Sequence, residues 1–376
     1  MIKKRVFIGL SGGVDSAVSV ALLQKAGYEV VGVFIRTWHP DFLECNEEEE
    51  RHDAMRVAAH LDIPFLTFDL EKVYKKEVAD YMIREYKAGR TPNPDVMCNK
   101  EVKFGAFLKK ALAMGADFVA TGHYVQVGEA KYIGVSYVLV NTQETPMYLS
   151  KGVDPSKDQS YFLWTLKQEQ LSKTLFPVGH LKKTEVRKLA KKFNLPVAQK
   201  KDSQGICFLG AVDLKEFLKH YIKEKKGKVL NEKGEEIGHH DGVVFHTLGE
   251  RHGFTITKKN PNDGAYYVVR KDIKKNILVV STSPQPSPCK GEGGIQLENI
   301  NWISKIPNPN KTYTAQIRYH GEFLPCKVNP AFNIGGVKCS TPRVAQVVFT
   351  KTVLVASGQS CVVYDGDICL GGGVVV

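Results

Sequence analysis

The sequence lacks the features that would place it in a membrane, form a zinc ribbon or build a disulfide framework. No apolar run approaches the ~20 residues that a membrane-spanning helix needs, and the apolar part of the start, residues 6–10, is too short for a signal peptide. Eight cysteines are scattered along 376 residues without a single CxxC pair. We therefore expect a cytoplasmic protein with no membrane partner.

Acidic residues are fewer than basic ones, with 40 Asp and Glu against 52 Lys and Arg. The resulting net charge of +12 favours an anionic partner, and nucleic acid is the leading candidate. Charge alone is equally compatible with a basic protein that binds no nucleic acid, so the motifs must decide.

Four histidines in the second half of the chain are the remaining candidates for a metal site, and they are His239, His240, His246 and His252. No cysteine accompanies them, and their spacing fits no standard zinc pattern. We predict that the protein holds no metal of its own.

The first 200 residues alternate between predicted strands and helices, which is typical of a parallel sheet covered on both faces. Residues 5–10 are predicted to form a buried strand, and apolar residues between Val14 and Leu22 then recur at helical spacing. Further strands are predicted at 29–35, 65–68 and 117–121, and further helices at 53–61, 70–88, 104–112 and 186–193. Ligands of such sheets bind at the carboxyl ends of the strands, so we expect the site there.

The pattern changes near residue 227 to short β-like segments separated by glycine turns. Residues 281–294 are rich in Ser, Pro and Gly and are typical of an exposed linker. A run of short predicted strands follows, which fits a small β-barrel. We therefore predict a doubly wound α/β catalytic domain (1–210), a central β-rich module (211–282), a linker (283–294) and a C-terminal β-barrel (295–376).

A glycine-rich turn, GLSGGVDS, joins the first predicted strand to the first predicted helix. Its residues are Gly9, Leu10, Ser11, Gly12, Gly13, Val14, Asp15 and Ser16. Glycines let backbone N–H groups approach phosphate oxygens, and the helix N-terminus adds positive potential. The turn lacks the lysine of the G-x-x-x-x-G-K-S/T loop, which argues against the usual γ-phosphate transfer. We predict a phosphate-binding loop with a different chemistry.

The segment SGGVDS resembles the pyrophosphate-loop motif of ATP pyrophosphatases, which attack the α-phosphate and leave an adenylated oxygen. Further segments are similar to those of tRNA-specific 2-thiouridylases: GRTPNPDVMCN at 89–99, ATGHY at 120–124, KDQSYFL at 157–163, FPVGHLKKTEVR at 176–187, KKDSQGICFLG at 200–210 and SGQSCVVYDGDICLGGG at 357–373. The resemblance covers nearly the whole chain. It implies a sulfurtransferase that uses ATP and Mg²⁺ to thiolate C2 of the wobble uridine (position 34) in tRNAs for Lys, Glu and Gln.

The resemblance assigns the chemistry to two cysteines. Cys98 falls at the family's catalytic nucleophile, and Cys207 falls at the cysteine that carries the transferable sulfur as a persulfide. Asp95 falls in the segment that contacts the target base and is a candidate general acid or base. Cys98 also lies near the predicted start of a helix, where unpaired N–H groups would favour its thiolate. The scheme needs a persulfide sulfur-donor protein and an external reductant, and we expect the enzyme to be a monomer.

The same resemblance implies contacts to ATP and tRNA. For ATP it adds Gly122 and Ile35, where the family usually has Met. For tRNA it points to Asn93, Pro94, Asp95, His123, Lys157, Asp158, Gln159, Arg318, Tyr319 and Gln359. Cations in this set suit phosphates, whereas amides and aromatic rings suit bases. In the central module, Glu250 of GERHG departs from the family's usual GQR-type stretch, which argues against a direct tRNA contact there.

Other interpretations remain open. A pyrophosphate-loop ligase that adds nitrogen needs no paired thiols, and an RNA-binding protein with a degenerate loop would consume no ATP. An iron–sulfur cluster would use Cys98, Cys207 and a third ligand. Either cysteine alone would also suit a buried hydrophobic position, and Asp95 would suit the N-cap of the following helix.

Overall fold

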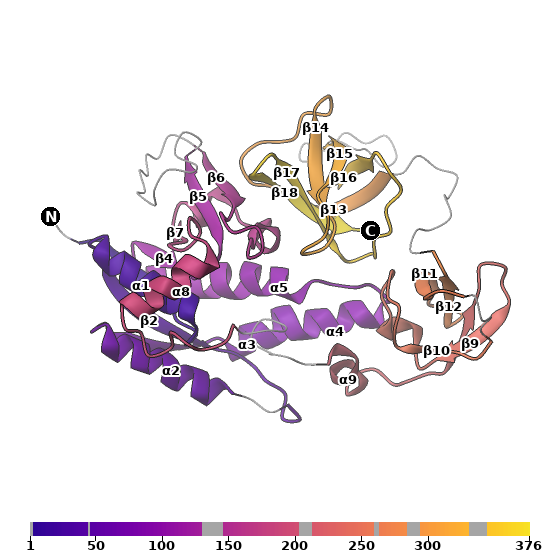
Figure 1. Ribbon diagram of the computed structural model, residues 1–376, viewed down its shortest axis with the longest axis horizontal. Helices are drawn as coiled ribbons and strands as arrows, with labels where there is room; N and C mark the ends of the chain where they lie inside the picture. Colours follow the sequence, from indigo (N-terminus) through magenta and orange to yellow (C-terminus); the bar gives the residue numbers. More distant parts are fainter. Residues whose placement is uncertain are drawn as a thin grey trace.

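The computed structural model describes residues 3–43, 46–129, 146–202, 213–258, 263–283, 294–330 and 344–376. Within these residues the strands form one sheet of eight strands and two of five. Figure 1 shows the α/β domain at one end, a β-rich module at the other and a barrel above them. The predicted fold class, a parallel α/β sheet with a β-rich module and a C-terminal barrel, is confirmed.

The first sheet is parallel and has the strand order β3-β2-β1-β4-β7. Its strands are β1 (Arg5–Gly9), β2 (Glu29–Arg36), β3 (Phe65–Asp69), β4 (Phe118–Ala120) and β7 (Thr174–Leu175). Val6 and Ile8 of β1 enter the core on one face of the sheet, and Phe7 enters the core on the other. The central strand is therefore buried on both faces, as expected of a parallel sheet.

Helices cover both faces of this sheet. The first face carries α1 (Val14–Lys25), α2 (Glu47–His60) and α8 (Lys183–Lys192). The second face carries two long helical segments that each contain a π-helical stretch: α3 (Glu71–Tyr74), η1 (Lys75–Ala79) and α4 (Asp80–Lys87), then α5 (Pro94–Met97), η2 (Cys98–Phe107) and α6 (Leu108–Ala113). The second of these segments begins ten residues before the predicted 104–112, so it includes Cys98.

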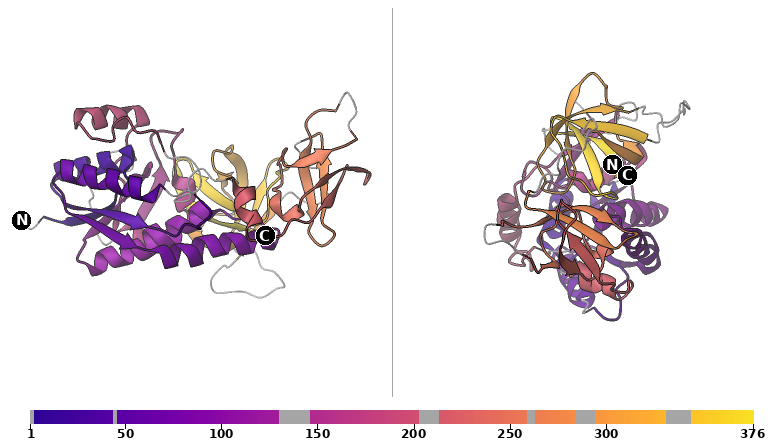
Figure 2. Two further views of the ribbon diagram at one scale, coloured as in Figure 1. Left: turned by 90° about the horizontal axis from the view of Figure 1, so that it is seen from below. Right: turned by 90° about the vertical axis from the view of Figure 1, so that its right-hand side faces the viewer.

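The central module is a five-stranded sheet with the order β10-β9-β8-β12-β11. Its elements are β8 (Gly227–Leu230), β9 (Glu236–His240), η5 (Val243–Phe245), β10 (Phe254–Ile256), β11 (Tyr267–Asp272) and β12 (Ile277–Ser281), and α9 (Leu214–Lys219) precedes them. Figure 2 shows the module at the end of the molecule away from the N-terminus. The apolar core of this module is small, so we expect its contacts with the catalytic domain to help hold it in place.

The C-terminal strands form a closed barrel with the order β13-β16-β15-β14-β17-β18, and β13 also pairs with β18. They are β13 (Gly294–Trp302), β14 (Thr312–Gln316), β15 (Leu324–Asn329), β16 (Val344–Phe349), β17 (Ser360–Asp365) and β18 (Ile368–Val375). A hairpin of the catalytic domain, β5 (Val125–Glu129) and β6 (Met147–Lys151), adds to β18 through Ser150 and Leu149. One sheet therefore runs through both domains.

A shared apolar core lies beneath this pairing. Tyr161 of η4 (Ser160–Leu163) and Trp164 come from the catalytic domain, and α7 (Gln168–Leu171) follows them. The Tyr161 hydroxyl donates to the Ser360 carbonyl at 2.9 Å, and Trp164 Nε1 donates to Ser360 Oγ at 3.0 Å. The barrel is thus joined to the catalytic domain by backbone pairing, buried rings and satisfied polar groups. Among the described helices, none combines the length and apolarity needed to cross a membrane.

Candidate active site

The phosphate-binding loop lies at the carboxyl edge of the parallel sheet, between β1 and α1, as predicted. Gly13 is the N-cap of α1, and no described side chain caps the first N–H groups of this helix. Ser16 Oγ donates to the Gly13 carbonyl at 3.1 Å and lies 3.4 Å from both the N–H and the Oγ of Ser11, which folds the loop over the helix end. The helix N-terminus can therefore offer N–H groups to an anion.

Gly122 lies at the end of the neighbouring strand β4 and closes one side of this loop. A Cβ at this position would stand 2.8 Å from the Ser16 nitrogen and 2.9 Å from the Asp15 carbonyl carbon. Only glycine allows the two segments to approach this closely. Ile35 lies near the end of β2, where its Cδ1 packs beside Gly9. Both residues assigned to ATP by resemblance are therefore at the same edge of the sheet as the loop.

Asp15 of the loop is held by a lysine that the sequence reasoning did not single out. Lys183, at the start of α8, places Nζ 2.7 and 2.8 Å from the two carboxylate oxygens of Asp15. The Tyr124 hydroxyl donates to Asp15 Oδ1 at 2.6 Å. Burial and the Asp15 carboxylate both raise the pKa of Tyr124 above its usual value, so the hydroxyl keeps its proton.

Lys183 also connects this loop to Asp202. The Lys183 ammonium lies 2.8 Å from Asp202 Oδ1, Lys157 lies 2.8 Å from Oδ2, and Arg187 donates to Oδ1 as well. Burial opposes ionisation of Asp202, but the ammonium groups of Lys157 and Lys183 outweigh it and hold its pKa well below the usual range. Lys183, Lys157 and Arg187 thus gather around Asp15 and Asp202 next to the phosphate loop, where Asp154 also accepts from the Lys183 N–H.

Cys98 lies in the second turn of its helix and is fully buried, with an exposed fraction of 0%. The helix starts at Pro94, and its N-cap is Asn93, whose Oδ1 accepts from the Val96 N–H at 3.2 Å. Asp95 is therefore not the N-cap, contrary to the alternative considered from the sequence. The Cys98 N–H already donates to the carbonyls of Asp95 and Pro94 inside the helix. The thiol therefore lies just beyond the first turn, where a helix start leaves N–H groups without intrahelical partners, and its thiolate character stays a prediction.

Cys207 lies outside the described residues. The described chain ends at Asp202, beside Lys183, and resumes at Asp213, whose carboxylate caps α9 by accepting from the N–H groups of Lys215 and Glu216. The distance between the two assigned cysteines is therefore untested. Cys98 forms no disulfide with any described cysteine.

Four of the residues assigned to tRNA on the catalytic domain have hydrogen-bond or ion-pair partners within the protein. His123 is 7% exposed, and its Nδ1 lies 2.8 Å from Thr121 Oγ1. Burial and nearby Lys103 lower the pKa of His123 far below its usual value, so the ring is neutral. Asp158 accepts from the N–H groups of Gly152 and Ser160, and Gln159 Oε1 accepts from the Tyr124 N–H. Lys157 pairs with Asp202, as described above.

The residues assigned to tRNA on the barrel have two different environments. Arg318 is exposed, whereas the ring of the neighbouring Tyr319 packs against Phe162 of the catalytic domain, with ring centroids 4.3 Å apart and planes at 44°. Burial, with Asp158 and Asp95 nearby, raises the pKa of Tyr319 to about 12. Gln359 is half-buried and donates from Nε2 to the Thr91 carbonyl at 2.8 Å. The barrel therefore faces the Pro94–Cys98 helix from the side.

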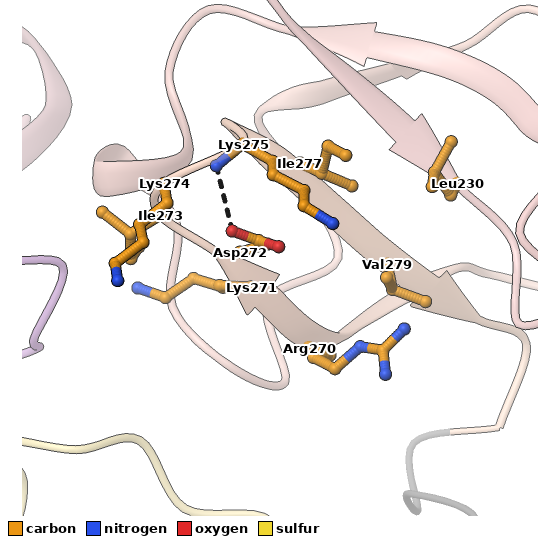
Figure 3. Close-up of a pocket in the computed structure, with 9 residues that line it drawn as sticks. All are labelled: Leu230, Arg270, Lys271, Asp272, Ile273, Lys274, Lys275, Ile277 and Val279. Carbon is orange, nitrogen blue, oxygen red and sulfur yellow. Dashed lines mark hydrogen bonds between the residues drawn. The ribbon is translucent and has the colours of Figure 1, made fainter.

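Two features of the central module bear on the sequence predictions. Glu250 accepts from the Thr247 N–H at 2.7 Å and lies 3.2 Å from His246 Nδ1, so its carboxylate stabilises a turn. Within the described part of the chain, no group of three or more His, Cys, Asp or Glu residues is arranged to hold a metal ion. A hollow of about 490 Å³ is lined by residues of β8, β11, β12 and the turn that joins β11 to β12. Figure 3 shows Arg270, Lys274 and Lys275 among these residues.

Comparison with known proteins gives matches along the whole chain. The family described as "tRNA methyl transferase HUP domain" matches residues 4–211, the "tRNA methyl transferase PRC-barrel domain" matches 215–282, and the "Aminomethyltransferase beta-barrel domain" matches 292–375. The tRNA-specific 2-thiouridylase MnmA of Geobacillus thermodenitrificans is 41% identical over 99% of this chain and 94% of its own length. The protein of the same name from Methylobacillus flagellatus is 39% identical over 100% of this chain and 99% of its own.

Proposed function

Since the chain belongs to the tRNA-specific 2-thiouridylases, we propose that it uses ATP to replace the C2 oxygen of the wobble uridine of tRNA with sulfur. The observation that carries this proposal is a phosphate-binding loop whose Asp15 is held by Lys183, with Lys157 and Arg187 in the same ion-pair network. Such a site suits attack at the α-phosphorus of ATP, where negative charge accumulates in the transition state. Its place at the sheet edge also suits a nucleotide.

In the first step, the uridine O2 attacks the α-phosphorus of ATP and pyrophosphate leaves. The C2 oxygen becomes part of an adenylate, so it can later depart as AMP rather than as a poor leaving group. Lys183 is the residue best situated to compensate the phosphate charge, because its ammonium already lies at the loop. Mg²⁺ would enter with the ATP phosphates, and Asp15 is the loop carboxylate that could contact it, since Mg²⁺ in such sites uses only one or two carboxylates.

In the second step, the terminal sulfur of a Cys207 persulfide attacks C2. The Cys98 thiolate then attacks Cys207 Sγ, the S–S bond breaks, AMP leaves with the original oxygen and 2-thiouridine remains. The products include a Cys98–Cys207 disulfide, which an external dithiol reduces before a donor protein restores the persulfide. Because a disulfide needs Cα atoms within roughly 7 Å, the two cysteines must meet at one stage of the cycle.

The direct test is reconstitution with ATP, Mg²⁺, a persulfide donor and tRNA for Lys, Glu or Gln, followed by mass analysis of the nucleosides. We expect 2-thiouridine at position 34 only, with one pyrophosphate released per thiolation. A transcript with cytidine at position 34 serves as the matched control and should remain unmodified. Modification without ATP, or thiolation at another position, would exclude the proposal.

Arg318 provides a test of tRNA binding that does not depend on the chemistry. Because Arg318 is exposed on the barrel beside the Tyr319–Phe162 contact, Arg318→Ala should weaken tRNA binding and reduce the slope of log affinity against log salt by about one unit. Arg56→Ala on α2 is the control, since α2 and the barrel lie on opposite sides of the molecule (Figure 1). An unchanged slope in the Arg318 variant, measured by filter binding, would remove this contact.

A further inference from the structure

The segment between α4 and the Cys98 helix is where all three parts of the protein meet. From the barrel, the Ser357 carbonyl accepts from the Thr91 N–H at 2.8 Å, and Gln359 Nε2 donates to the Thr91 carbonyl at 2.8 Å. Both backbone polar groups of Thr91, which is 6% exposed, are thus satisfied by a segment more than 260 residues away. Since buried backbone groups need partners, this contact is required for the local conformation.

The central module holds the same segment from the opposite side. Lys271 Nζ donates to the Gly89 carbonyl at 2.9 Å and to the His246 carbonyl at 2.6 Å, which connects the end of α4 to the module. Figure 3 shows Lys271 pointing out of the hollow, toward the catalytic domain. The hydroxyls of Thr91 and Thr247 lie 3.2 Å apart. Thr91 is therefore in contact with the barrel and the central module at once.

The close approach of the barrel depends on Gly358. This residue has a φ of +93°, and a Cβ there would lie 3.0 Å from the nitrogen, carbonyl carbon and oxygen of Thr91. A side chain would push the 357–359 turn away from Thr91 and break both of its hydrogen bonds. The local sequence of the barrel is therefore adapted to this one contact.

The position of Thr91 affects Cys98 because very little chain separates them. Only Pro92, whose φ is fixed, lies between Thr91 and Asn93. Asn93 caps the helix that carries Cys98 in its second turn. A shift of the barrel against Thr91 would move the helix start, and with it the buried thiol.

We infer that Gln359 is a positioning residue for Cys98, through which the barrel sets the placement of the catalytic helix, with Lys271 bracing the same segment from the central module. The family resemblance assigns Gln359 to tRNA, but one N–H of its amide donates to the Thr91 carbonyl inside the protein. Docking of tRNA on the barrel would thus act on Cys98 through the protein. The inference rests on the proposed function only for the role of Cys98 in thiolation.

Gln359→Glu tests the contact because it keeps the side-chain shape and removes the donor. A fully buried thiol reacts only when the structure opens locally, so its alkylation rate reports how firmly the helix start is held. We expect Cys98 to be alkylated about tenfold faster than in the parent protein, measured by peptide mass spectrometry without ATP or tRNA. In thiolation assays, kcat should fall about tenfold, while the KM for tRNA should change less than about twofold.

Gln168→Glu is the matched control, since Gln168 also donates from the catalytic domain to a barrel carbonyl, that of Ile303, at 2.6 Å. It loosens the same pair of domains away from Thr91, so Cys98 should react at the parental rate. If the Gln359→Glu protein does not fold, Gln359→Met removes the donor without adding charge and should give the same increase.

Two results would overturn the inference. One is an alkylation rate of Cys98 that is unchanged by Gln359→Glu and Gln359→Met, or that Gln168→Glu raises equally. The other is a raised KM for tRNA with kcat and alkylation unchanged, which would make Gln359 a tRNA contact only. If the parent protein made no 2-thiouridine while Cys98 alkylation still responded to Gln359, the proposed function would fail and the positioning role would stand.

Discussion

The Cys98→Ser protein is expected to accept sulfur from the donor and still form no 2-thiouridine beyond about one thousandth of the parental rate, because the hydroxyl that replaces the thiol cannot cleave the persulfide S–S bond. The bound sulfur should be visible as a mass increase of one sulfur atom on the intact protein. Binding of tRNA should be retained, since Cys98 is buried inside the catalytic domain.

The complementary variant is Cys207→Ser, which should lose the protein-bound sulfur and all thiolation while it keeps tRNA binding. Cys369→Ala is the control for loss of a buried cysteine: burial raises the pKa of the Cys369 thiol to about 12, so this residue has no thiolate to contribute. Full 2-thiouridine formation by the Cys207→Ser protein would refute the assignment. Iron bound to anaerobically purified protein would instead support the cluster interpretation.

The second large effect is expected at Lys183, whose contact with Asp15 only the structure reveals. Lys183→Met should slow release of pyrophosphate by about 10²–10³-fold, because it removes the cation that faces the developing phosphate charge. Binding of tRNA should change little, because we expect phosphate binding and most of the tRNA docking to use different surfaces. The measurement is pyrophosphate release under saturating ATP and tRNA, together with tRNA affinity at the same salt concentration.

Lys188→Met on the same helix is the matched control, since Lys188 is exposed and lies five residues further along α8. It removes the same charge from the protein without touching Asp15 or Asp202. Equal loss of pyrophosphate release in both variants would mean that Lys183 contributes only to the overall positive charge of the protein. Loss of tRNA binding together with pyrophosphate release would indicate that Lys183 is mainly structural.

The parallel sheet and the phosphate loop could be predicted because their signals are local. Apolar runs of strand length, helical spacing from Val14 to Leu22 and glycines between them fix the order strand, loop, helix. Alternation of such units then leaves a parallel sheet as the main solution, with the loop at its carboxyl edge. Gly122 and Ile35 were assigned to ATP only by the family resemblance, and they lie at this same edge of the sheet.

The remaining parts of the site depend on contacts between residues far apart in the sequence. Lys183 and Asp15 are separated by 168 positions, and Gln359 and Thr91 by 268. A surface lysine and an ion-pairing lysine look alike in one sequence, because only the fold supplies the partner. The start of the Cys98 helix was predicted only approximately, because the apolar stripe at 104–112 marks its later part and Asp95 rather than Asn93 was considered as its N-cap. The helix begins with the N-cap Asn93 and with Pro94 as its first residue. Both residues precede the apolar residues that recur at helical spacing.

The hairpin β5–β6 has a consequence for how the protein can be divided. Its strand β6 pairs with the edge of β18 at Ile368 and Cys369, so part of the barrel's backbone pairing comes from the catalytic domain. A barrel expressed alone would expose this strand edge and the apolar surface around Tyr364, and such edges readily pair with other chains. The two domains should therefore melt in a single cooperative transition, and the isolated barrel should aggregate although its own strands close.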